Sequence, residues 1–369
     1  MLFDTAPKER REDLYDREKE LNEASEALRL GERLVIVYGI RRIGKSSLVK
    51  VILNETLVPH VIVDVREIYY KDGSIPEARL VKRVLEGFRD RLTWYKRVGF
   101  DLREALKKIK KVRVGDFEIE VKPGSRVSLT EVLSGIDSWC GEHGMRFVFV
   151  FDEAQYLRFS NVRYDGLLAW AVDNLRNTTF ILTGSEAGVL REFLRINDAE
   201  APLFGRYRRE IYLERFSKEQ STEFLRKGFE EVGVEPDVKE IEEAVRFLDG
   251  IVGWLTYYGY YRGVRKLKQE EVIPTLLEEG SKMVLAELEK IITPSRERYV
   301  AILKAIAQGA SAWSDVKAYV VAKSGPVNDA RFTELLTNLV KYGYVVKENN
   351  NYRIPDPIVK HAVLEKLHL

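Results

Sequence analysis

A run of apolar residues leads directly into two glycines, a lysine and two serines in the segment VYGIRRIGKSSLVK, residues 37–50. Four residues separate Gly39 from the Gly-Lys-Ser triplet that starts at Gly44, which is the spacing of a phosphate-binding P-loop. Glycines let the backbone wrap around a phosphate with its N–H groups directed inward, and the following helix N-terminus adds a positive dipole end. We therefore expect Lys45 to reach the β- and γ-phosphates of a nucleotide and the Ser46 hydroxyl to bind Mg²⁺.

The other loop residues are expected to contribute less directly. Ser47 follows the triplet and supports the turn at the start of the helix. Arg41, Arg42 and Ile43 lie inside the loop and are counted with the nucleotide-binding residues. Two roles stay open for the two arginines. One of them could contact phosphate or a neighbouring subunit, and a solvated loop charge is the more common role for at least one of them.

Two acids end a second apolar run, RFVFVFDEAQYL at residues 146–157. A P-loop needs an acid at the tip of a neighbouring strand to hold Mg²⁺ through water, and Asp152 has that position. Glu153 comes next and is placed to orient or deprotonate an attacking water. A passive nucleotide site has no need of a second carboxylate, so the pair favours hydrolysis over binding alone.

Polar residues after two later segments complete the candidate site. Thr183 or Ser185, in LTGSE, could donate a hydrogen bond to the γ-phosphate or to the water, although hydroxyls at strand ends also form turns. Arg206, in PLFGR, is either an arginine finger at the nucleotide or a brace for the sheet.

These motifs lie on a regular alternation of strands and helices, which predicts a doubly wound α/β domain with a parallel sheet. The run before the P-loop is too apolar for a half-exposed strand and reads as a central one. An additional hairpin is expected at residues 112–121. The predicted strands cover residues 33–39, 60–67, 146–157, 178–186 and 209–217.

Strand patterns disappear after residue 217, and helical spacing of apolar residues continues to residue 292. Three further helices and the two short strands of YVVKENNNYRIPDP then predict a winged helix. The expected domains are a P-loop core at 1–216, a helical lid at 217–292 and a winged-helix domain at 293–369.

Composition limits the classes of partner. The 60 Lys and Arg nearly balance the 58 Asp and Glu, so the net charge of +2 gives no general attraction to nucleic acid or to an acidic membrane. The one cysteine, Cys140, cannot form an internal disulfide, and no apolar stretch reaches the roughly 20 residues that span a bilayer. We expect a cytoplasmic protein with no membrane partner.

The residues resemble the archaeal ATPase family, a STAND-like branch of the AAA+ and related P-loop ATPases. The resemblance covers residues 10–290 and extends to the winged-helix region. The segments that carry it are DREKEL (16–21), GIRRIGKSSL (39–48), FVFVFDEAQYL (147–157), LTGSE (182–186) and PLFGR (202–206).

The resemblance implies an ATPase core with a helical lid and a winged helix, binding ATP or ADP with Mg²⁺. It implies that adenine lies near DREKEL, so Arg17 joins the nucleotide-binding residues. It also implies that Asp152 binds the metal and that Glu153 polarises water. AAA+ relatives often carry a lid arginine, whereas LDGIVGWLTYYG (248–259) has Trp254 and other aromatics. This departure fits a switch better than a processive motor.

Three functions are compatible with these patterns. The first is an ATP-dependent conformational switch with a protein partner. The second is a DNA-binding regulator that uses helix 327–343, but its bases Arg331 and Lys341 are opposed by Asp329 and Glu334, which favours protein docking. The third, a small-molecule kinase, is less attractive because the paired acids point to water as the acceptor.

Overall fold

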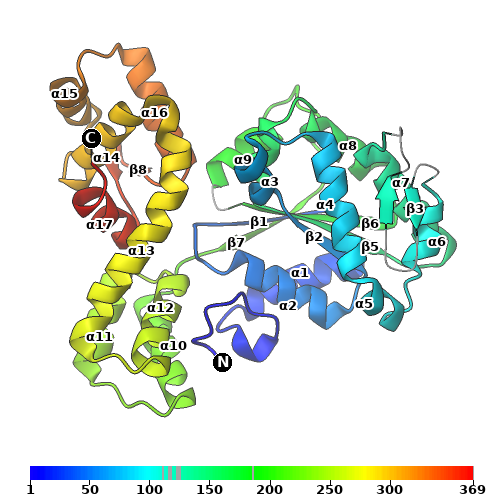
Figure 1. Ribbon diagram of the computed structural model, residues 1–369, viewed down its shortest axis with the longest axis horizontal. Coiled ribbons are helices and arrows are strands. Elements are labelled where there is room, and N and C mark those ends of the chain that lie inside the picture. Colours follow the sequence, from blue (N-terminus) through cyan, green and yellow to red (C-terminus); the bar gives the residue numbers. More distant parts are fainter. Residues whose placement is uncertain (110–111, 115–118, 122–125, 185–186, 369) are drawn as a thin grey trace. The chain divides into compact units, whose positions relative to one another are not determined.

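The computed structural model describes residues 1–109, 112–114, 119–121, 126–184 and 187–368. Its contacts divide the chain into two compact units (Figure 1). The sheet unit comprises residues 8–39 and 45–213, and the C-terminal unit comprises residues 1–7, 40–44 and 214–369. Within the described part of the chain, no helix combines the length and the apolar character that crossing a membrane requires.

The sheet unit is built on five parallel strands in the order β2-β5-β6-β1-β7. Strands β1, β5 and β6 are buried almost throughout, as expected for a parallel sheet covered on both faces. We call the edge at which the strands end the carboxyl edge, and the opposite one the amino edge. The strands are β1 (Leu34–Gly39), β2 (His60–Asp64), β5 (Phe147–Asp152), β6 (Thr178–Gly184) and β7 (Arg209–Leu213).

Helices cover both faces of this sheet. Figure 1 shows α1 and α2 on one side and α3, α4 and α7 on the other. In β1 the alternate residues Leu34, Ile36 and Tyr38 belong to the core formed with α4 and α7. The elements are η1 (Arg11–Asp13), α1 (Glu18–Leu30), α2 (Lys45–Thr56), α3 (Val65–Asp72), α4 (Glu77–Asp90), α5 (Leu92–Arg97), α6 (Leu102–Lys107), α7 (Leu129–Glu142), η2 (Ala154–Phe159), α8 (Tyr164–Asn174) and α9 (Ala187–Leu194).

The parallel sheet is confirmed, but several strands are shorter than predicted. β2 ends at Asp64 because its carboxylate accepts the N–H of Glu67 and so caps α3. β5 ends at Asp152, and the 3₁₀ turn η2 begins two residues later, at Ala154. The predicted hairpin is present as β3 (Val112–Val114) and β4 (Ile119–Val121), whose turn lies outside the described residues.

The C-terminal unit is helical apart from one short hairpin. The hairpin turns at Asn349 and Asn350, whose φ values of 48° and 64° suit a two-residue turn between strands. The elements are α10 (Lys218–Glu231), α11 (Val238–Leu248), α12 (Val252–Gly259), the π-helical η3 (Tyr260–Val264), α13 (Gln269–Ile292), η4 (Thr293–Ser295), α14 (Arg296–Ala307), α15 (Trp313–Ser324), α16 (Asp329–Lys341), β8 (Val346–Glu348), β9 (Asn351–Arg353) and α17 (Pro357–Glu365).

The first residues of the chain pack in the C-terminal unit, which differs from the predicted assignment of 1–216 to the core. The Phe3 ring is fully buried and contacts the rings of Phe224 and Phe229 edge-on. A Cβ atom at Gly228 or Gly259 would lie within 2.3 Å of this ring, so both glycines are needed for Phe3 to fit. Sequence spacing gives no sign of so distant a contact.

Candidate nucleotide-binding site

The two ends of the P-loop lie in the sheet unit. Gly39 ends β1 at the carboxyl edge, and Lys45 begins α2. The Lys45 side chain is buried, and its ammonium donates to the Gly39 carbonyl oxygen at 3.0 Å. The ammonium is therefore held across the mouth of the loop, which is the position from which a P-loop lysine meets phosphate. Ser47 lies on the same helix, but its hydroxyl accepts the N–H of Lys8 at 3.0 Å.

Ser46, Asp152 and Thr183 form one hydrogen-bond network at the carboxyl edge. The Ser46 hydroxyl donates to one oxygen of Asp152 at 2.9 Å, and the Thr183 hydroxyl donates to the other. Thr183 also accepts the backbone N–H of Glu153 at 3.1 Å. Thr183 thus connects the two acids through its hydroxyl, and its expected contact with phosphate stays a prediction. Ser185, the alternative, lies outside the described residues.

Glu153 is held in an uncommon backbone conformation immediately after β5. Its φ of 54° and ψ of 47° lie in the left-handed region, which costs energy for a residue with a side chain. The Gln155 amide donates to the Glu153 carboxylate at 2.6 Å. The sharp turn thus ends the strand directly after Asp152.

Negative charge accumulates at this edge. Asp64 ends β2 and pairs in register with Asp152. Burial raises the pKa of the Asp64 carboxyl, and the charges of Asp152 and Glu153 act in the same direction, against Arg66. The adjacent hydroxyl of Ser46 and carboxylate of Asp152 are hard oxygen donors, which fit Mg²⁺ bound together with phosphate.

The middle of the P-loop packs in the C-terminal unit. Arg41 forms an ion pair with Glu287 of α13, and its guanidinium lies 4.8 Å from the centre of the Tyr344 ring. Ile43 is buried. Arg41 is therefore not a solvated charge, because its guanidinium is paired with a carboxylate of the protein, and a contact with phosphate stays a prediction.

Arg42 is held in the same unit by α12. Its guanidinium lies 4.2 Å from the centre of the Trp254 ring, a cation–π contact, and its carbonyl oxygen accepts the Gly253 N–H at 2.8 Å. A Cβ atom at Gly253 would lie 2.7 Å from that of Arg42, so only glycine permits this approach. Arg42 and Gly44 have φ values of 60° and 97°. The backbone of the loop is thus left-handed where a phosphate cradle needs it.

Arg206 lies away from the P-loop of its own chain, and its catalytic role stays a prediction. Its guanidinium is bidentate to Asp173 at 2.8 and 2.6 Å. Arg206 precedes β7, whose first residue Arg209 is level with Val35 near the start of β1. Arg206 is therefore at the amino edge, whereas Gly39 is at the carboxyl edge. Of the two alternatives, the brace describes its contacts.

Arg17, the residue expected near adenine, stands before α1 and is buried. Its guanidinium pairs with Glu20 at 3.2 Å in the first turn of that helix. The ion pair with Glu20 helps to hold the Arg17 side chain. A contact of Arg17 with adenine stays a prediction.

Sequence reasoning missed Asp64 and Gln155. Asp64 was hidden because its strand was expected to continue to residue 67, although an acid ending a strand is the same signal that identified Asp152. Gln155 is the last residue of DEAQ, but no rule of sequence spacing predicts a hydrogen bond from it to Glu153. Neither residue was therefore assigned to the site.

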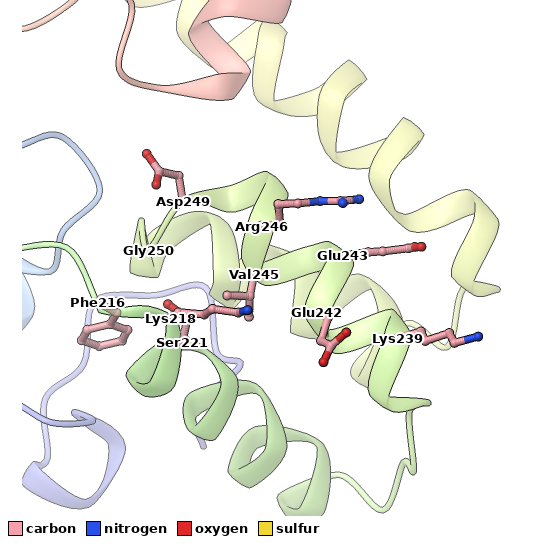
Figure 2. Close-up of a pocket in the computed structure, with 10 residues that line it drawn as sticks. All are labelled: Phe216, Lys218, Ser221, Lys239, Glu242, Glu243, Val245, Arg246, Asp249 and Gly250. Carbon is pink, nitrogen blue, oxygen red and sulfur yellow. The ribbon is translucent and has the colours of Figure 1, made fainter.

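A separate cavity of about 480 Å³ lies in the C-terminal unit beside α10 and α11 (Figure 2). None of the predicted site residues lines it. Three basic and three acidic side chains line the cavity, so their formal charges cancel. They are Lys218, Lys239, Arg246, Glu242, Glu243 and Asp249.

Fold and site together define a P-loop ATPase, and comparison with known proteins agrees. The family described as "ATPase domain predominantly from Archaea" matches residues 14–257. The chain belongs to this family, and it is a nucleotide-binding ATPase. The family described as "MCM protein C-terminal winged helix-turn-helix domain" matches residues 293–355, which confirms the winged helix. A search of curated proteins gives no match.

Two solved structures illustrate the likeness. The Walker-type ATPase PABY2304 of Pyrococcus abyssi is 38% identical, with 99% of this chain and 100% of that chain covered and a TM-score of 0.84. The ORC2 protein of Aeropyrum pernix, in complexes with ADPNP and ADP, is 14% identical, with 98% and 97% covered and a TM-score of 0.61. The second likeness concerns the fold alone.

Proposed function

We propose that the protein is a Mg²⁺-dependent ATPase whose nucleotide state sets the conformation of its C-terminal unit. Lys45 binds the β- and γ-phosphates, Ser46 and Asp152 hold the metal ion, and Glu153 is the base. Thr183 keeps both acids in position. These roles follow from the hydrogen bonds at the carboxyl edge and from the P-loop spacing.

The chemistry assigned to these residues is hydrolysis. The oxygen of a water attacks the γ-phosphorus as Glu153 takes a proton from it, and the bond from phosphorus to the bridging oxygen breaks, releasing phosphate and ADP. Lys45 offsets the negative charge on the phosphates during this step. Mg²⁺, when bound, would neutralise charge on the same oxygens.

One observation carries the proposal of a switch: residues 40–44 of the P-loop pack within the C-terminal unit, although both ends of the loop belong to the sheet unit. A phosphate bound by the loop backbone fixes the conformation of these residues. The same residues are joined to Trp254, Glu287 and Tyr344. Release of the γ-phosphate would then change the balance between two conformations of the C-terminal unit.

Förster transfer between dyes on Arg29→Cys in the sheet unit and Lys323→Cys in the C-terminal unit tests this switch. Both positions are exposed, whereas the native Cys140 is buried. In a Glu153→Gln background, which keeps ATP intact, we expect the transfer efficiency with ATP to differ from that with ADP. Equal efficiencies would contradict the switch and leave an ATPase only.

A matched pair of variants on α13 tests the proposed coupling. Glu287→Gln removes the partner of Arg41, and we expect it to reduce the difference between ATP and ADP by at least half. Glu278→Gln, on the same helix, removes a partner of Lys366 and Lys282 and should leave the difference unchanged. Equal behaviour of both variants would contradict coupling through Arg41.

The winged helix favours a second candidate, a nucleotide-regulated DNA-binding protein, but the charges of α16 weigh against it. Arg331 donates to Glu334 at 2.8 Å and to Ser295 at 2.7 Å, so its charge is neutralised within the protein. Groove binding depends on cations that neutralise phosphates. We therefore favour a protein partner. Salt-sensitive binding of duplex DNA at submicromolar protein, lost in Arg331→Ala, would reverse this preference.

A further inference from the structure

We propose that Gln155 is a positioning residue, whose side-chain amide holds the carboxylate of Glu153 in the orientation from which it accepts the proton of the attacking water. This inference rests on the proposed function, in which Glu153 is the base. It adds a residue that acts through Glu153 without contacting nucleotide or metal.

The first observation is the contact itself. The Gln155 amide nitrogen donates to a Glu153 oxygen at 2.6 Å, which is short for a hydrogen bond from nitrogen to oxygen. Hydrogen bonds to an ionised group are shorter and about twice as strong as neutral ones. A carboxylate held by such a bond loses rotational freedom, so it is prepared for proton transfer before the substrate arrives.

The second observation is that Gln155 is rigidly held. Its side chain is only 1% exposed, and its turn η2 packs against β6 and α9. A Cβ atom at Gly184 would lie 3.0 Å from the Gln155 amide oxygen, so β6 leaves space for the amide where another residue would crowd it. A buried and confined amide can hold a partly exposed carboxylate, whereas a mobile surface group cannot.

The third observation is that the Glu153 backbone is fixed independently. Its N–H donates to Thr183, and its left-handed conformation turns the chain between β5 and η2. With the backbone anchored by Thr183, the remaining freedom of Glu153 lies in its side chain. Gln155 restrains that freedom, so the two contacts together define where the carboxylate points.

The test is a double-mutant cycle on ATP hydrolysis with the full-length chain. Gln155→Met keeps the length and much of the volume of the side chain and removes the donor. We expect kcat to fall about 10- to 100-fold, the usual effect of losing a supporting partner, with KM for ATP within twofold of wild type. Glu153→Gln should lower kcat by about 10²- to 10⁴-fold.

The double variant decides between positioning and packing. If Gln155 acts through Glu153, adding Gln155→Met to Glu153→Gln lowers kcat no further. Three results would each overturn the inference: a double variant whose loss of kcat is the product of the two single losses, a Gln155→Met variant with unchanged kcat, or a Gln155→Met variant with raised kcat. Tyr156→Phe is the matched control, because Tyr156 lies in η2 beside Gln155 and its hydroxyl is 3.4 Å from that of Tyr70 in α3. We expect this variant to retain the wild-type rate.

The same cycle separates this inference from the proposed function. A Glu153→Gln variant that hydrolyses ATP at the wild-type rate would overturn the assignment of the base and, with it, the role of Gln155. An inactive Glu153→Gln beside a fully active Gln155→Met would overturn the role of Gln155 alone. Unfolding curves of both single variants confirm that a lower kcat belongs to folded protein.

Discussion

The acids at the two edges of the parallel sheet differ in the partners that hold them. At the amino edge, acids meet arginines: Asp173 binds Arg206, and Glu32 accepts from Arg209 at 3.1 Å. At the carboxyl edge, Asp64 also pairs with an arginine, Arg66, at 3.3 Å, but Asp152 accepts hydroxyl groups and Glu153 accepts an amide. Neutral donors orient a carboxylate but leave its charge in place, so Asp152 keeps an affinity for cations that an arginine-paired acid such as Asp173 has lost.

The comparison teaches that the partner of a charged residue indicates its role better than its motif does. Arg206 stands in a motif that suggests catalysis, yet it is bound to Asp173. Arg41 and Arg42 stand inside a phosphate loop, yet they contact Glu287 and Trp254. Lys45 is buried, and its ammonium donates to the Gly39 carbonyl oxygen at the mouth of the loop.

The largest expected effect comes from removing the cation that faces this negative edge. We expect Lys45→Ala to lower ATP hydrolysis by about 10³-fold, because it removes the ammonium that we propose offsets the γ-phosphate charge at the mouth of the loop. Phosphate release without any acceptor measures it. Lys50→Ala on the same helix, which loses only a pair with Glu9, should keep the wild-type rate. Similar rates in both variants would place the phosphate elsewhere.

The next effect concerns β2, which has His60 at the amino edge. Burial, aided by the Arg91 charge, lowers the pKa of His60 to about 4. The unfolded imidazole gains its proton near pH 6.5, so between pH 6.5 and 4 the unfolded state binds more protons and the free energy of unfolding falls as the pH falls. This loss amounts to about 3 kcal/mol across the window.

Denaturant unfolding at pH 7 and at pH 4.5 measures the contribution of His60. His60→Gln should lose much of the acid sensitivity between these values, and His143→Gln, at an exposed position, should not. The same pH dependence in wild type and His60→Gln would contradict a buried neutral imidazole at the amino edge.

A smaller effect is expected at Asp152, the proposed metal ligand, because its neighbours at the carboxyl edge remain. Asp152→Asn should raise the Mg²⁺ concentration for half-maximal hydrolysis about 10- to 100-fold, because it removes a charge and keeps the shape. Asp64→Asn, its register partner, should change this concentration less than about threefold. If Asp64→Asn has the larger effect, the metal lies nearer β2 than we propose.

The smallest effect belongs to the paired charges of the amino edge. Asp173 and Arg206 are both partly exposed, so Arg206→Ala should cost less than about 1 kcal/mol of unfolding free energy. Denaturant unfolding at pH 7 measures it. A tenfold or greater loss of hydrolysis in this variant would show that Arg206 serves a catalytic role that its contacts in one chain do not reveal.

Local patterns predicted much of this molecule. The P-loop, the buried strands and the hairpin of the winged helix each depend on neighbouring residues and could be found from spacing. Even so, α17 was missed, although Asp356 caps it and Pro357 begins it, a known pattern at helix starts. The segment YVVKENNNYRIPDP, which contains these two residues, predicts only two short strands.

What could not be predicted depends on residues far apart in the chain. Thr183 meets Asp152 because β6 lies beside β5, and no spacing rule gives that register. Arg41 meets Glu287 across 246 positions of sequence. The amino-edge position of Arg206 follows from the pairing of β7 with β1. In each case the sheet order or the tertiary packing, and not the motif, decides the role.

Calorimetric titration of ATP into the Glu153→Gln variant, with and without Mg²⁺, tests most directly whether the acids of the carboxyl edge bind a metal nucleotide. We predict saturable binding of one ATP per chain that weakens at least tenfold when Mg²⁺ is removed with a chelator. Equal affinity with and without Mg²⁺, or the absence of any binding heat at several temperatures, would contradict the account.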